Sequence, residues 1–217
     1  METFERSGRI FRVVQIGRGG PSVFWGTGAH EAPEALIERL EGQNLLLVAY
    51  QAEDWNRCFS PWPAPPAFGS EGFAGEGART LRWLTDECAP QIASRFGARE
   101  KLLCGYSLAG LFAVYAWLRG MPVEGIGCFS GSLWYDRFAD WAQSQSAAPV
   151  RLALSIGDRE KRTGNPRMAQ GEACTLLLAA HWAKQMPVRF WLEKGGHFDH
   201  TTARIARGID GLLGAAE

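Results

Sequence analysis

One serine of this sequence lies where it could act as a nucleophile. Ser107 stands in the Gly-Tyr-Ser-Leu-Ala-Gly string of residues 105–110, between an apolar run and a helix-like segment. Such a sharp strand-to-helix turn, a nucleophile elbow, exposes a serine hydroxyl for attack on a carbonyl. Strand and helix approach closely there, so small residues must flank the serine; Gly105 and Ala109 do so, although glycine is usual at the second place. We therefore predict that Ser107 is a nucleophile.

A histidine near the end of the chain could supply the base that a serine needs. His197 follows Gly195 and Gly196, directly after the apolar segment 188–192. A serine hydroxyl is a weak nucleophile until a base takes its proton, and the glycines allow a tight turn that aims the imidazole at the elbow. His200 competes for this role, but it lies further on, at the start of the last helical segment, so we favour His197. His30, after an earlier strand, could line the same site.

Two carboxylates follow the predicted strand 150–156 and could orient the histidine. A carboxylate there could accept a hydrogen bond from the far imidazole nitrogen, fix the tautomer and stabilise the imidazolium. Asp158 and Glu160 both qualify by position. The other carboxylate would then cap a turn or lie solvated at the surface, and the residues alone leave the choice open.

The oxyanion that forms during acyl transfer needs backbone donors. The residue after the nucleophile usually supplies one N–H group, which is that of Leu108 here. A second should come from the loop after a short early strand. Thr27 is our candidate, since the glycines on both sides of it suit a backbone that turns sharply.

Strands and helices alternate along the chain. This alternation predicts a three-layer α/β/α sandwich with a mostly parallel central sheet, and the candidate residues then gather beyond the carboxyl ends of the strands. The stretch 51–75 is irregular, but it is too aromatic for disorder. Besides the elbow, the predicted strands are 9–16, 22–25, 44–50, 126–129, 150–156 and 188–192, and the helices are 33–41, 76–96 (interrupted near Pro90), 133–144, 168–185 and 201–213.

Length and composition fit a compact enzyme. The 217 residues suit a single domain, 1–217, and 46% of them are hydrophobic. Basic and acidic residues are equal at 23 each, which gives no electrostatic case for nucleic acid or an anionic membrane. The five cysteines are scattered and odd in number, and the first residues show no secretory signal, so we expect a cytoplasmic protein with reduced thiols.

These motifs together resemble one family. The order serine, acid, histidine is that of the α/β-hydrolases, and the chain is similar to their esterase D-like branch, most of all to the siderophore trilactone esterases that act on enterochelin or bacillibactin. The resemblance rests on residues 23–28, the loop 50–66, residues 105–112, 129–134, 157–160 with 165–166, and 195–198.

The resemblance implies a role for each matching residue. It makes Ser107 the nucleophile, His197 the base, and Leu108 with Thr27 the oxyanion donors, and its Gly-x-x-Glu string points to Glu160 as the acid. Some members of the siderophore branch use only a serine–histidine dyad. The branch also places basic residues around the substrate mouth. We expect three residues to contact the substrate, and a further run of basic residues could assist: Arg57, Tyr106 and Trp134, then Arg159, Lys161 and Arg162.

The sequence thus predicts a serine hydrolase that needs neither metal nor organic cofactor. It would cleave a small-molecule carboxylic ester, of the siderophore type or another, through an acyl-enzyme. The alternatives are an acyltransferase or a thioesterase on the same scaffold, or a binding protein without catalysis. Aromatic residues would suit a flat or acyl substrate. We expect no nucleic-acid or membrane partner, and the oligomeric state stays open.

Overall fold

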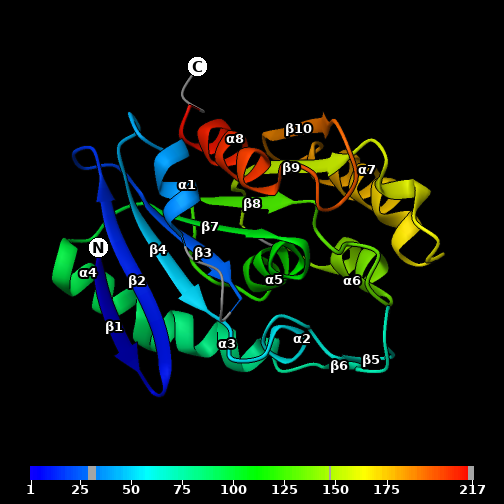
Figure 1. Ribbon diagram of the computed structural model, residues 1–217, viewed down its shortest axis with the longest axis horizontal. Helices are drawn as coiled ribbons and strands as arrows, with labels where there is room; N and C mark the ends of the chain where they lie inside the picture. The colour runs from blue at the N-terminus through cyan, green and yellow to red at the C-terminus, as the bar shows by residue number, and fades with distance from the viewer. Residues whose placement is uncertain (29–32, 147, 215–217) are drawn as a thin grey trace.

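An eight-stranded sheet forms the centre of the protein (Figure 1). This computed structural model describes residues 1–28, 33–146 and 148–214. The second strand along the sheet runs antiparallel to both of its neighbours, and all other neighbouring strands run parallel to each other. The strands lie side by side in the order β1 (Glu2–Arg6), β2 (Arg9–Ile16), β4 (Leu45–Gln51), β3 (Ser22–Thr27), β7 (Lys101–Tyr106), β8 (Gly125–Phe129), β9 (Arg151–Gly157) and β10 (Val188–Glu193).

Helices cover both faces of the sheet, which confirms the predicted three-layer α/β/α arrangement. One face packs on α1 (Glu34–Arg39) and α8 (Thr201–Leu213). The opposite face holds the larger core, to which α3 (Gly77–Trp83), α4 (Ala89–Phe96), α5 (Ser107–Leu118) and α7 (Gly171–Trp182) contribute. Figure 1 shows α1 and α8 above the sheet and the α3–α4 helix below it. In the described part of the chain, no helix is long and apolar enough to cross a membrane.

Burial explains why these segments take these forms. Six of the seven residues of β4 are buried, as expected for an apolar strand covered on both faces. Helix α5 is buried at every position after Ser107, so its apolar side chains need no polar face. Helix α8 approaches the sheet closely at Gly208, where a Cβ atom would lie 2.0 Å from the ring of Phe129. The two glycines of α8, Gly208 and Gly211, therefore let this helix pack directly on the sheet.

The stretch 51–75, which we predicted to be irregular, forms short elements of secondary structure. It contains α2 (Trp55–Cys58) and a two-stranded ribbon of β5 (Pro63–Ala64) and β6 (Phe73–Ala74). The helix predicted over 76–96 continues past Pro90 through a π-turn at Leu84–Cys88. A proline lacks the N–H group and crowds the preceding turn, and a wider turn just before it accommodates this defect.

One expectation about the elements was wrong, and one strand was missed. The helix predicted over 133–144 starts only at α6 (Phe138–Ser144), because Arg137 has a left-handed backbone (φ 60°) that a helix cannot continue through. The sequence analysis also missed β1, whose residues are all at least partly exposed at the sheet edge. A short edge strand of mostly polar residues carries no apolar run that would reveal it.

Candidate active site

Ser107 lies at the junction of β7 and α5, the turn predicted from the sequence. Its backbone is left-handed, with φ 55°, a conformation that costs energy for a residue with a side chain and is typical of strained functional turns. A Cβ atom at Gly105 would lie 2.3 Å from the carbonyl carbon of Ala109. No larger residue fits between strand and helix there, so the two small residues hold Ser107 at the carboxyl end of the sheet.

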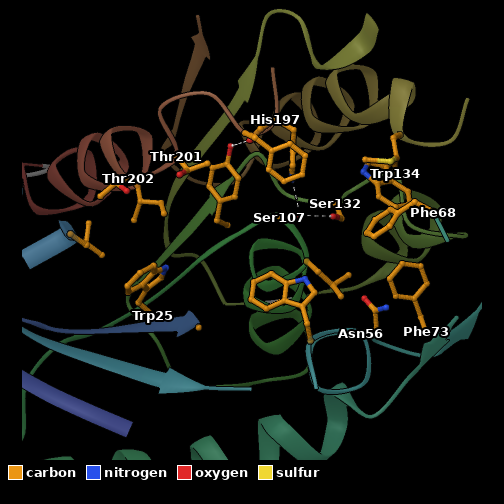
Figure 2. A pocket seen from close by; sticks show the side chains of 18 of the residues that line it. Trp25, Asn56, Phe68, Phe73, Ser107, Ser132, Trp134, His197, Thr201 and Thr202 are labelled. Atoms are coloured by element: carbon orange, nitrogen blue, oxygen red, sulfur yellow. Dashed lines mark hydrogen bonds between the residues drawn. The ribbon is translucent and has the colours of Figure 1, made fainter. Parts of the chain in front are cut away.

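His197 links Ser107 to Glu160, and Figure 2 shows His197 next to Ser107. Its Nε2 atom lies 3.0 Å from Ser107 Oγ, and its Nδ1 atom lies 2.8 Å from Glu160 Oε2. An ionised carboxylate can only accept, so Nδ1 carries the proton and Nε2 is free to accept one from the serine hydroxyl. This is the geometry of a serine–histidine–acid triad.

Glu160 is almost fully buried and heavily hydrogen-bonded. Its side chain is 8% exposed. Its Oε1 atom accepts from Ser130 Oγ (2.7 Å), from the Gly157 N–H group (2.7 Å) and from Arg204 Nη1 (3.1 Å). Burial alone would raise the pKa of Glu160, but the interactions with His197, Ser130 and Gly157 outweigh it and lower the pKa below its usual range. Glu160 is therefore ionised at neutral pH.

The competing acid, Asp158, contacts the turn rather than the imidazole. Asp158 Oδ1 accepts from the N–H group of Gly195 at 2.9 Å, and this hydrogen bond is the main cause of the lowered pKa of Asp158. On the other side of the turn, Asp199 Oδ2 accepts from the N–H group of Gly196 at 2.8 Å. The two aspartates thus fix the glycine turn that carries His197. His200 directly precedes α8, and His30 lies outside the described residues.

Sequence reasoning missed Arg204, which joins several parts of the site. This α8 side chain is 2% exposed. Besides Glu160, its Nη1 atom donates to Ser130 Oγ (3.1 Å) and Tyr106 Oη (3.2 Å), and its Nη2 atom donates to the Lys194 carbonyl (2.9 Å). Tyr106 in turn donates to the carbonyl of His197 at 2.5 Å. Arg204 precedes Gly208 by one helical turn on the buried face of α8, and this spacing could have revealed it.

A second serine, Ser132, lies beside Ser107. Its Oγ atom is 3.5 Å from Ser107 Oγ, and its N–H group donates to the Ser107 carbonyl at 3.0 Å. The string 130–132 therefore contributes to the site twice, because Ser130 holds Glu160 and Ser132 faces Ser107. The sequence showed this string as a family motif and assigned no role to either serine.

The candidate oxyanion donors lie at the ends of neighbouring parallel strands. Leu108 follows Ser107 and lines the cavity above it. Thr27 ends β3 and is buried, but it is absent from the described lining of the cavity. Its carbonyl accepts from the Ala52 N–H group, and its hydroxyl donates to the Tyr50 carbonyl at 3.3 Å. In a parallel ladder the N–H and C=O groups of one residue face the same neighbouring strand, so the Thr27 N–H group faces β4, which does not fit the predicted role of oxyanion donor. The adjacent Gly26 lines the cavity, and a Cβ atom there would meet the ring of Phe59 at 2.9 Å.

A cavity of about 520 Å³ opens over Ser107 and His197, a size suited to a small organic ligand. Two of the predicted substrate contacts, Tyr106 and Trp134, line it. Arg57 is absent from the described lining; it belongs to α2 and lies 3.8 Å from both Asp54 and Glu76. The described residues contain no cluster of three or more His, Cys, Asp or Glu side chains that could hold a metal ion.

Comparisons with known proteins place this fold in a class. No family model matches the chain. A curated protein of Bacillus subtilis (strain 168), described as "Uncharacterized protein YbbA", is 29% identical over 140 residues, which are 61% of this chain and 56% of that protein. The match therefore spans little more than half of the length of that relative.

Solved structures are similar over nearly the whole chain. The siderophore hydrolase EstA from Aspergillus nidulans is 18% identical, with 96% of this chain and 91% of that chain covered and a TM-score of 0.75. An IroE-like serine hydrolase from Shewanella oneidensis is 16% identical, with 94% and 75% covered and a TM-score of 0.76. The BES protein from Bacillus cereus is 15% identical, with 98% and 95% covered and a TM-score of 0.72. The chain has the α/β-hydrolase fold, which confirms the resemblance at the level of the fold.

Proposed function

We propose that this protein is a serine hydrolase that cleaves a carboxylic ester through an acyl-enzyme. The observation that carries the proposal is the unbroken series of hydrogen bonds from Ser107 through His197 to Glu160 at the floor of a cavity. The similar structures support it, since two of them are a siderophore hydrolase and an IroE-like serine hydrolase. A fold alone does not fix a reaction, so the geometry of the site bears the main weight.

The first half of the reaction forms the acyl-enzyme. Ser107 Oγ attacks the ester carbonyl while His197 Nε2 takes the hydroxyl proton. The carbonyl oxygen becomes an oxyanion that accepts a hydrogen bond from the N–H group of Leu108, which lines the cavity. When the tetrahedral intermediate collapses, the bond to the leaving oxygen breaks, and that oxygen receives the proton from His197.

The second half returns the enzyme to its starting state. Water attacks the acyl carbonyl and gives a proton to His197, the bond to Ser107 Oγ breaks, and the serine recovers its proton as the acid leaves. Glu160 stabilises the imidazolium that forms in each half. Because Glu160 accepts three further hydrogen bonds on its other oxygen, its carboxylate cannot rotate away, and Arg204 and Ser130 act as positioning residues for it.

Hydrolysis of p-nitrophenyl acetate and butyrate tests the proposal. The wild-type protein should release p-nitrophenol, and Ser107→Ala should fold normally but lose turnover by a factor on the order of 10⁴ or more. Ser94→Ala, at an exposed position of α4, is the matched control and should turn over like the wild type. If Ser107→Ala retained wild-type turnover, the proposed function would be wrong.

A further inference from the structure

The cavity over Ser107 carries no fixed charge on its described walls. None of the described lining residues is Asp, Glu, Lys or Arg, and its polar lining side chains include Asn56, Thr201 and Thr202 besides the residues around Ser107. Apolar and aromatic side chains make up most of the rest. A charged group that entered this cavity would lose water without gaining a counter-ion, which costs several kcal/mol.

Aromatic side chains gather on one side of Ser107. Figure 2 shows Trp134, Phe68 and Phe73 together on that side, whereas Trp25, Thr201 and Thr202 lie on the other side of Ser107. Ser107 thus lies between an aromatic compartment, the side of Trp134, Phe68 and Phe73, and a second compartment at Trp25. Flat aromatic groups pack well against such ring faces and edges.

The rim of the cavity exposes apolar surface. Phe68 is 68% exposed and Phe198 is 86% exposed, and both line the cavity. Such large apolar side chains are unfavourable in water, and where they border a cavity they indicate a binding site for an apolar ligand. Phe198 directly follows His197, so an apolar group bound at this rim would lie close to the reacting atoms.

Most basic side chains around the rim already have acidic partners. Arg159 pairs with Asp199 at 3.1 Å, Lys161 pairs with Glu172 at 3.0 Å, and Arg167 pairs with Asp136 at 2.7 Å. The Arg167 guanidinium also lies 5.5 Å from the ring centre of Trp134. The exposed Arg162 borders a smaller neighbouring hollow, not the cavity over Ser107. The described rim therefore lacks the set of unpaired cations that a polyanionic substrate would need.

We propose that the substrate is an uncharged ester with an aromatic group on one side of its carbonyl and an apolar group on the other. The aromatic group would occupy the aromatic compartment, and the other group would lie against Trp25. This inference rests on the proposed function and adds the substrate class to it. It also predicts that anionic esters, such as iron-bound catecholates, are poor substrates.

A pair of esters that differ only in charge tests the proposal. In p-nitrophenyl pentanoate a methyl group ends the acyl chain, and in mono-p-nitrophenyl glutarate a carboxylate replaces it. We expect kcat/KM to be lower for the glutarate by a factor on the order of 10², since its carboxylate must lose water or be held out of the cavity. A glutarate that reacts as fast as the pentanoate, or faster, would overturn the proposal.

Variants at the exposed rim test the aromatic compartment without endangering the fold. Phe68→Ala should raise KM about threefold to tenfold for p-nitrophenyl esters, whose leaving group is aromatic, and much less for methyl butyrate. Leu192→Ala, at a 56% exposed position of β10 outside the cavity lining, is the matched control and should change neither. An equal effect of Phe68→Ala on aryl and alkyl esters would contradict an aromatic compartment.

The two proposals fail in different ways. If the neutral esters react but charge or aromaticity makes no difference, the substrate class is wrong and the serine hydrolase stands. If none of the esters reacts above the Ser107→Ala background, the proposed function is wrong and the substrate class falls with it.

Discussion

Glu160→Gln is the substitution whose consequence the structure defines most sharply. Three donors surround Glu160 Oε1, from Ser130, Gly157 and Arg204. In the glutamine variant the amide oxygen must stay among these donors, so the NH₂ group faces His197 Nδ1. A donor at that place forces Nδ1 to accept and moves the imidazole proton to Nε2. The nitrogen beside Ser107 Oγ would then be protonated and could not act as a base.

The size of the effect follows from this change of tautomer. We expect kcat/KM for p-nitrophenyl butyrate to fall by about 10³–10⁴, as for a triad with the wrong tautomer, which corresponds to about 4–5 kcal/mol of activation free energy. The variant should also be less stable by about 3–5 kcal/mol, because the buried Arg204 guanidinium would lose its counter-ion. Thermal unfolding must therefore show that the variant is still folded at the assay temperature.

Asp158→Asn is the matched control for Glu160→Gln. An asparagine oxygen can still accept the hydrogen bond from the Gly195 N–H group, so turnover should change by no more than about threefold. If Glu160→Gln kept turnover within tenfold of the wild type while folded, Glu160 would not be the acid. A larger loss for Asp158→Asn than for Glu160→Gln would reverse the two assignments.

Three further changes test other parts of the account. Gly105→Ala should prevent soluble folding or lower the melting temperature strongly, because its Cβ atom would lie 2.3 Å from the backbone of Ala109. An unchanged melting temperature would contradict the close packing of β7 on α5. Arg204→Met should destabilise the protein by about 3–5 kcal/mol in urea unfolding, because it leaves the Glu160 carboxylate buried without a counter-ion. A loss of unfolding free energy below about 1 kcal/mol would show that the Arg204–Glu160 pair is not needed for stability. Because the pKa of Glu160 is lowered by folding, the carboxylate stabilises the protein at neutral pH, and this contribution is lost as the pH falls through the folded-state pKa. The difference in stability between wild type and Glu160→Gln should therefore shrink on acidification, and a difference that grew would refute the sign.

The sequence predicted the fold well because its strands are buried apolar runs. The segments around β4, β7 and β9 read as strands from their apolar residues alone, and strand–helix alternation then required a largely parallel sheet. Edge strand β1 and the delayed start of α6 escaped prediction. A partly exposed edge strand has no apolar run, and a single left-handed residue such as Arg137 leaves no mark on hydrophobic periodicity.

The candidate site was predictable as a set of positions but not as a set of contacts. Ser107, His197 and Glu160 each follow a strand, so the fold brings them to the same edge of the sheet. The positions alone could not separate Glu160 from Asp158, because both follow β9 and the turn between them decides which carboxylate faces His197; only the family resemblance pointed to Glu160. Arg204 was missed because a charged residue in an amphipathic helix is normally exposed. The assignments of one domain over 1–217 and of a cytoplasmic location stay predictions.

Labelling with a fluorophosphonate tests the central claim most directly, since this probe reacts with an activated serine and needs no turnover. The account predicts that one equivalent of probe modifies Ser107, that peptide mapping finds no label on Ser132 at 3.5 Å distance, and that ester hydrolysis falls in proportion to labelling. Label on another residue, or full hydrolysis by fully labelled protein, would contradict the account.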